Sequence, residues 1–134
     1  MKQLATFSLA CFTLVSVATE GRAQMRPPIP MTAAAYASAH RGQSIHLLIR
    51  VESRRRSQLQ GEILDRRTDS LYTQTGKRTE LFFSDDTPVV MGSQSDVVVG
   101  ALVFVDGILT SRNRADVKKA VVVTRDVTVE PARH

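Results

Sequence analysis

The most concentrated chemical feature of the sequence is a set of closely spaced cations. They lie between residues 50 and 78: Arg50, Arg54, Arg55, Arg56, Arg66, Arg67, Lys77 and Arg78. Guanidinium and ammonium groups gathered on one surface attract phosphates and acidic sugars, so the pattern predicts a site for an anionic polymer. If residues 45–65 form a bent pair of strands, the first of these cations lie together at one rim. The alternative interpretation is a solvated, charged surface that prevents exposed strand edges from pairing with other chains.

One aromatic side chain fits such a site. Proteins that bind single-stranded nucleic acid offer exposed aromatic rings on which bases stack. After residue 23 the sequence holds only five aromatic residues, Tyr36, Tyr72, Phe82, Phe83 and Phe104, and we expect a core to need at least three of them. Tyr72 is the best candidate for an exposed ring. The shortage of aromatic residues makes nucleic acid the weaker candidate among the anionic ligands.

Residues for metal binding or nucleophilic catalysis are few and scattered. His40, His46 and His134 are not grouped, and His46 alternates outward on a predicted strand, where we expect it to be exposed. The pair Asp85 and Asp86 lacks the spacing of a calcium loop and indicates a turn. The serine-hydrolase motif, the phosphate-binding loop and the dinucleotide fingerprint are absent from the sequence. We therefore expect no catalytic residue, no metal site and no cofactor, and predict that the protein is not an enzyme.

The N-terminus has the pattern of an export signal. A positively charged start is followed by an apolar run over residues 4–18, and Gly21 and Ala23 place small residues before a cleavage site. Residues 1–23 are therefore predicted to be a signal peptide cleaved after Ala23, which sends the protein to the bacterial periplasm or out of the cell without a transmembrane span. The alternatives are an uncleaved anchor and lipidation at Cys11, the single cysteine.

Length and composition favour one globular domain after the signal peptide. The chain has 134 residues, of which 43% are hydrophobic and 23% charged, and a formal net charge of +5. This length excludes a multidomain enzyme, and this composition differs from that of disordered chains. The positive charge favours anionic partners such as lipid head groups, acidic glycans or nucleic acid.

Hydrophobic periodicity predicts a mostly β domain that begins with a short helix. Prolines make residues 24–31 an extended leader, and an alanine-rich run after Thr32 predicts a helix that stops at Gly42. Alternation of apolar and polar residues predicts five or six strands. These expected strands cover residues 45–52, 59–65, 70–75, 78–83, 101–110 and 120–130, with an irregular connection over 89–100 that holds a short strand, a helical turn or both.

Three glycines and one arginine refine this prediction. Gly61 marks a bend or a close backbone crossing, and Gly76 opens a two-residue hairpin between the third and fourth expected strands. Gly107 predicts a bulge in a central strand covered on both sides, followed by a loop over residues 111–116. Arg125 interrupts the valine face of the last strand, which predicts a bulge or a barrel mouth at that position.

Four short segments carry a family resemblance. They are QGEI at residues 60–63, LFFSDDTPV at 81–89, VGALVFVDG at 99–107 and AVVV at 120–123. Together they resemble the small exported bacterial OB-like domains, a group without an assigned function. The resemblance covers residues 45–130 and rests on turn glycines and alternating apolar positions. It implies a small five- to six-stranded OB-like barrel within residues 32–134.

These observations lead to two functional hypotheses. The first is an exported, non-catalytic binding or assembly module of the bacterial envelope, with an envelope protein as partner and the leader and helix available for docking. The second is a binder of an anionic polymer, such as an acidic glycan, a lipid head group or single-stranded nucleic acid, through the arginine-rich rim.

Overall fold

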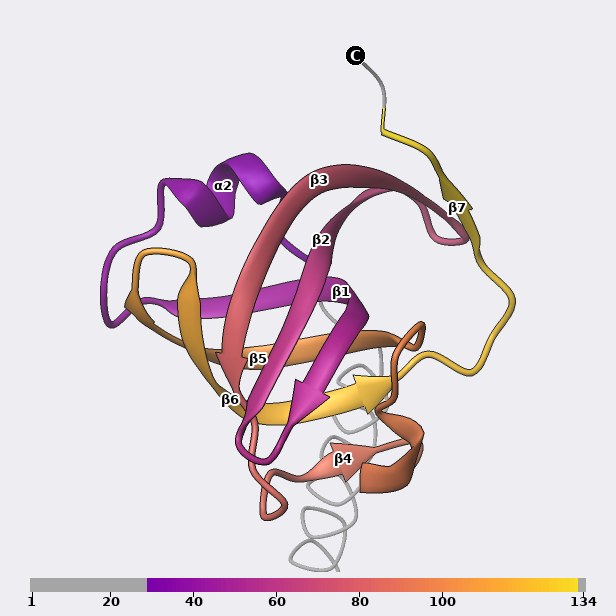
Figure 1. The fold of residues 1–134 in the computed structure, drawn as a ribbon. Helices are drawn as coiled ribbons and strands as arrows, with labels where there is room; N and C mark the ends of the chain where they lie inside the picture. Colours follow the sequence, from indigo (N-terminus) through magenta and orange to yellow (C-terminus); the bar gives the residue numbers. More distant parts are fainter. Residues whose placement is uncertain (1–28, 133–134) are drawn as a thin grey trace, which may run out of the picture.

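Long strands dominate the protein because apolar and polar side chains alternate over most of residues 44–122. The computed structural model describes residues 29–132, which form one short helix, one 3-10 turn and seven strands in a mixed sheet (Figure 1). The elements are α2 (Ala33–Ala37), β1 (Ser44–Arg55), β2 (Gln58–Thr68), β3 (Leu71–Phe82), β4 (Val89–Val90), η1 (Gln94–Asp96), β5 (Leu102–Ser111), β6 (Arg114–Val122) and β7 (Thr128–Glu130). The predicted mostly β class with a short helix in front is confirmed.

The strand pairings form a closed circuit. The sheet order is β4-β6-β5-β1-β2-β3-β7, with antiparallel pairing between β1 and β2, β2 and β3, β1 and β5, and β5 and β6. In addition, β3 pairs in parallel with β6, where Glu80 to Phe82 lie opposite Arg114 to Asp116. Five strands therefore connect in the cycle β1-β2-β3-β6-β5 and back to β1, and the short strands β4 and β7 extend it at its edges.

The main hydrophobic core lies on the inward face of the five long strands. The alternating residues Ile45, Leu47, Ile49 and Val51 of β1 are buried in it, as the sequence predicts. Gly61 allows the close crossing that was expected, because a Cβ atom there would lie 2.8 Å from Ile49 Cδ1. Thus β1 and β2 approach each other more closely than a side chain at residue 61 would permit.

A second hydrophobic cluster covers the outward face of the same strands. Leu48, Leu64, Tyr72 and Phe104 are buried in it, and the partly buried Val121, Val123, Val127 and Val129 pack against them. The valine face predicted over residues 120–130 is confirmed, and so is the covering of β5 on both sides. The prediction of one continuous strand is wrong, because β6 ends at Val122 and β7 is a separate strand that pairs in parallel with Leu71 to Thr73 of β3. Arg125 lies in the exposed connection between them.

The hairpin predicted at Gly76 is also wrong, because β3 runs through this position without turning back. In the register of β2 against β3, Glu62 lies opposite Arg78 and Leu64 lies opposite Gln74, so three residues of β3 lie opposite Ile63 alone. Gly76 has φ +72°, and its N–H donates to Glu62 Oε2 at 3.0 Å. The left-handed glycine therefore forms a bulge held by a buried carboxylate rather than a turn.

Helix α2 begins where the sequence predicts but ends earlier. The Thr32 hydroxyl accepts from the Ala35 N–H and caps the helix. The helix stops at Ala37, and Gly42 lies instead in the turn before β1, where its N–H donates to the Leu109 carbonyl at 2.8 Å. The Tyr36 phenol, which lies 2.7 Å from Thr79 Oγ1, anchors α2 over β3. Burial raises the pKa of Tyr36 above its usual value of 10.0, and the bond to Thr79 partly opposes this shift.

The remaining connections agree with the predictions in part. The segment 89–100 holds both a short strand, β4, and a helical turn, η1. The bulge at Gly107 is confirmed by a register shift between β5 and β6. The loop expected over residues 111–116 is shorter than predicted, because only Arg112 and Asn113 separate the two strands, with Asn113 at φ 61°.

The predicted signal peptide, residues 1–23, and most of the leader over 24–31 lie outside the described residues. At the end of this leader, the Met31 N–H donates to the His46 carbonyl at 2.9 Å. Within residues 29–132, no helix is long and apolar enough to cross a membrane.

Candidate functional site

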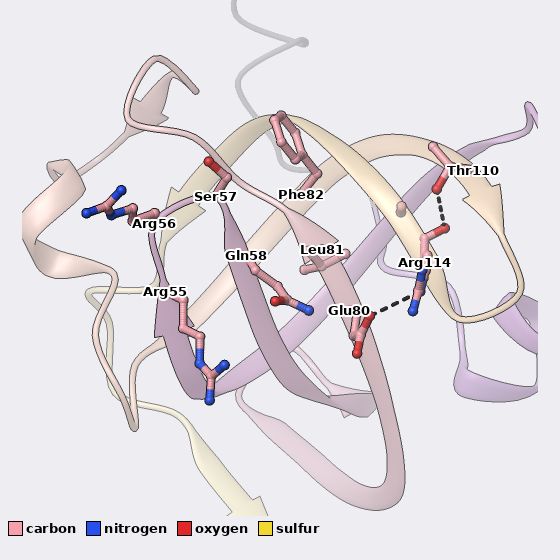
Figure 2. A pocket seen from close by; sticks show the side chains of 10 residues that line it. Arg55, Arg56, Ser57, Gln58, Glu80, Leu81, Phe82, Thr110 and Arg114 are labelled. Carbon is pink, nitrogen blue, oxygen red and sulfur yellow. Dashed lines mark hydrogen bonds and ion pairs between the residues drawn. The ribbon is translucent and has the colours of Figure 1, made fainter.

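A groove of 640 Å³ lies where the β1–β2 turn meets the β5–β6 turn (Figure 2). The first residues of β2 and the last residues of β3 form its floor. The lining residues are Arg55, Arg56, Ser57, Gln58, Glu80, Leu81, Phe82, Thr110, Arg114 and Ala115. The parallel pairing of β3 with β6 brings these segments together from distant parts of the sequence.

Two arginines at the β1–β2 turn supply the positive charge on one side of the groove. β1 ends at Arg55 and β2 begins at Gln58, so Arg56 and Ser57 form a two-residue turn. Arg55 and Arg56 are exposed, and neither side chain makes a hydrogen bond or ion pair with any residue of the described segment 29–132. Both guanidinium groups therefore retain their hydrogen-bonding capacity for an anionic ligand.

The opposite side of the groove combines an ion pair with an exposed aromatic ring. Arg114 Nε lies 3.1 Å from Glu80 Oε2, and the Thr110 hydroxyl donates to the Arg114 carbonyl (Figure 2). Phe82 is 54% exposed, whereas its neighbour Phe83 is fully buried. Consecutive residues of an extended segment point to opposite faces, so Phe82 points outward between the buried Leu81 and Phe83, and its ring is exposed to solvent.

A second hollow of 480 Å³ lies on the other side of the same turn. It is lined by Arg54, Arg55, Arg56, Asp85, Ser95, Val97, Val98 and Val99. The β1–β2 turn therefore separates two concave surfaces and contributes Arg55 and Arg56 to both.

Arg54 has a different environment from the two arginines that follow it. Its guanidinium donates to the carbonyls of Gln94 at 2.5 Å and Val97 at 3.0 Å, and also to the side chain of Gln94. Its Cζ lies 4.9 Å from the centre of the Phe83 ring. These contacts fix the β1–β2 turn to the η1 segment, so Arg54 positions the turn while Arg55 and Arg56 stay available.

The other predicted cations do not join the groove. Arg50 of β1 forms an ion pair with Glu62 of the neighbouring strand β2 at 2.8 Å, and Arg78 of β3 forms an ion pair with Glu52 of β1 at 2.8 Å. Arg66 pairs with Asp69 at 2.5 Å, and Arg67 Nε donates to Thr73 Oγ1 at 3.2 Å. Lys77 is exposed in the bulge of β3. Arg66 lies eight residues after Gln58 along β2, which is roughly 25 Å from the turn at the usual rise of a strand.

Two expectations about exposed side chains are wrong. Tyr72 is only 2% exposed, because the segment after β6 crosses over it and places Val127 and Val129 in the same cluster. The His46 side chain is only 17% exposed; Nδ1 contacts Asp106 Oδ1, and the ring stacks on Phe104. Both residues lie on the outward faces of strands, where the second hydrophobic cluster shields them from solvent. Among the described residues, no three His, Cys, Asp or Glu side chains are grouped so as to hold a metal ion.

Phe82 and Arg114 line the groove but were not predicted as site residues. Two adjacent aromatic residues within a strand were a sufficient signal that one of them faces outward. Arg114 had no such signal, because its place in the groove depends on the long-range pairing of β6 with β3.

Comparison with known proteins adds no assignment to this geometry. No family model, no curated protein and no solved structure matches the chain.

Proposed function

We propose that this protein is an exported, non-catalytic binding module of the bacterial envelope that holds an anionic partner in the groove between its β1–β2 and β5–β6 turns. The observation that carries this proposal is that the unpartnered Arg55 and Arg56 and the exposed ring of Phe82 line one concave surface.

The finer fold in this proposal is an OB-like barrel. The cycle of five strands supports it, because the OB-fold is a small five-stranded barrel. The position of the groove also supports it. OB-folds bind oligonucleotides and oligosaccharides with the loop between their first two strands and the loop between their last two, and in this cycle those are the β1–β2 and β5–β6 turns.

The composition of the groove favours binding over catalysis. Its ionisable residues are Arg55, Arg56, Arg114 and Glu80, and Glu80 is already paired with Arg114. No histidine or cysteine lines the groove to activate the Ser57 hydroxyl as a nucleophile. Three arginines against one carboxylate leave a net positive surface that complements an anionic chain, and the ring of Phe82 offers a face for a sugar or a base.

Docking of an envelope protein at the N-terminal segment is the second candidate. Ile29, four residues before the start of α2 at Ala33, is 70% exposed. Deleting residues 25–41 tests this candidate, and a partner complex that survives the deletion contradicts it. Because α2 packs on β3 through Tyr36, an Ile29→Ser variant tests the same contact without removing the helix.

The groove proposal is tested by measuring affinity against sodium chloride concentration for the chain from Gln24 onward. The probes are a polyuronate, an acidic peptide, a single-stranded oligonucleotide and vesicles of anionic phospholipid. We expect the R55S/R56S variant to lose at least about tenfold in affinity and to show a flatter salt dependence.

The matched control is the R66S/R67S variant, which removes the same charge from the far end of β2. We expect this control to bind like the wild type. If the two double variants lose affinity equally, only net charge attracts the ligand. If neither loses affinity, the groove is not the binding site.

A further inference from the structure

Exposed apolar side chains lie on both sides of the β1–β2 turn. On the groove side, Phe82 is 54% exposed, and the N–H of the next residue, Phe83, donates to the Ser57 carbonyl in the turn at 3.1 Å (Figure 2). On the side of the second hollow, Val98 and Val99 are 52% and 68% exposed. Three large apolar side chains therefore face solvent beside a single turn.

The exposed valine pair is held in place against this turn. The preceding residue, Val97, is fully buried, and its carbonyl accepts from Arg54 at 3.0 Å. On the other side of the pair, the Gly100 N–H donates to the Val51 carbonyl at 2.8 Å. Because the segment is fixed at both ends, the two valines form a preorganised apolar surface, and binding through them costs little conformational entropy.

The charges around the turn leave an uncompensated positive surface. The groove and the second hollow together are lined by arginines and by two carboxylates, those of Glu80 and Asp85. Glu80 pairs with Arg114 at 3.1 Å, and Asp85 lies 3.8 Å from Arg54. The exposed Asp86 lines neither hollow. The two remaining arginines, which lie at the turn and line both hollows, have no partner within residues 29–132, so they complement an anionic partner on either side.

One class of anionic partner matches the cations and the apolar side chains together. A phospholipid bilayer carries phosphates at its surface, which pair with guanidinium groups, and an apolar layer directly beneath them. A soluble polyanion can pair with the arginines, but it has no apolar layer in which Val98 and Val99 could be buried. The turn is a ridge between two hollows, so a flat bilayer can also contact both of its sides, whereas a ligand in the groove contacts only one.

We infer that the anionic partner of this protein is the head-group layer of a phospholipid bilayer, which the β1–β2 turn meets with Arg55 and Arg56 on the phosphates and with Phe82, Val98 and Val99 inserted beside them. The inference rests on the proposed function, because the lipid phosphates are then the anions that Arg55 and Arg56 hold. Such a surface lies in the bilayer interface without crossing it. With two cations and three apolar side chains, the attachment is reversible and depends on both anionic lipid and salt.

The first test is co-sedimentation of the chain from Gln24 onward with vesicles. One set of vesicles contains equal parts of phosphatidylglycerol and phosphatidylcholine, and the other contains phosphatidylcholine alone. We expect the wild type to bind the anionic vesicles in preference to the neutral ones. The R55S/R56S variant should bind the anionic vesicles at least about tenfold more weakly, because two cations are lost from the surface that meets the phosphates.

The apolar contribution is measured with the V98S/V99S variant. It should bind anionic vesicles about tenfold more weakly than the wild type, because two apolar side chains no longer enter the bilayer. Both valines are exposed, so the variant keeps the fold, and neither lines the groove, so its affinity for a polyuronate should not change. The matched control is Ile108→Ser, which removes an exposed apolar side chain of β5 outside both hollows and should bind vesicles like the wild type.

A fluorescent label reports insertion independently of affinity. The chain has no cysteine after residue 23, so Val98→Cys gives one attachment point for an environment-sensitive fluorophore. We expect its emission to shift to shorter wavelength on anionic vesicles, because the label enters an apolar environment. The same label on Ile108→Cys should show no shift.

Failure of the inference and failure of the proposed function give different results. If the wild type does not bind anionic vesicles while R55S/R56S weakens binding of a soluble polyanion, the groove holds a soluble polymer and the inference is overturned. Vesicle binding that V98S/V99S leaves unchanged also overturns it, because the second hollow then takes no part. If binding of neither the vesicles nor the soluble probes depends on Arg55 and Arg56, the proposed function is wrong as well.

Discussion

Replacing Arg54 with methionine should destabilise the protein far more than the same change at Arg55. Methionine retains much of the aliphatic length but removes three donated hydrogen bonds and the contact of the cation with Phe83. Hydrogen bonds from a charged group contribute about 1.5–3 kcal/mol when buried, and an exposed cation–π contact about 0.5–1 kcal/mol. The Arg54 side chain is 22% exposed, so water can replace part of this loss. We therefore expect a decrease of about 2–3 kcal/mol in the free energy of unfolding, or roughly 10 °C in Tm.

The assay is urea unfolding followed by circular dichroism, because the protein has no tryptophan. Arg55→Met is the matched control, since it removes the same charge one residue along the chain from a side chain without a partner in the described residues. The control should stay within about 0.5 kcal/mol of the wild type. If R54M and R55M are equally stable, Arg54 does not fix the turn to η1, and the division of the arginines into one positioning residue and two binding residues is refuted.

Two further predictions concern Gly107 and Tyr36. A Cβ atom at Gly107 would lie 2.2 Å from the Asp116 carbonyl oxygen, so Gly107→Ala should lower the free energy of unfolding in urea by at least about 2 kcal/mol. Thr110→Ala, on the same strand, should lower it little. Equal losses for the two variants would contradict the tight bulge. Burial raises the pKa of Tyr36, so the unfolded chain releases this proton at a lower pH than the folded protein, and the free energy of unfolding should fall as pH rises above about 10. Tyr36→Phe should lower the free energy of unfolding by about 1 kcal/mol at pH 8, because the bond to Thr79 is lost. The difference in free energy of unfolding between this variant and the wild type should shrink at pH 10.5 and above. A difference that stays constant with pH would contradict the burial argument.

The strands that could be predicted are those whose alternation is uninterrupted. β1 has a buried apolar residue at every second position from Ile45 to Val51, so its inward residues follow from the sequence alone, and the continuous apolar run at the start of β5 indicates a strand covered on both sides. Gly76 could not be assigned in this way. A glycine with positive φ fits both a hairpin turn and a bulge, and only the continued pairing of β2 with β3 on both sides of it selects the bulge.

The candidate site was predictable only as a concentration of charge. The triple arginine at residues 54–56 correctly marks the turn beside the groove, but it does not show that Arg54 is fixed by η1, because η1 lies forty residues further along the chain. Tyr72 was assigned wrongly for a related reason. Alternation identifies the outward face of a strand, but it does not show whether another segment covers that face.

The second hydrophobic cluster also affects the order in which the chain can fold. Residues 123–130 are synthesised after all five long strands, yet their valines cover Leu48, Leu64 and Tyr72. Until this segment emerges, a sheet that has already paired exposes these side chains to water. Nascent or truncated chains that end before Val123 therefore present an apolar face, the kind of surface by which partly folded chains aggregate or bind chaperones.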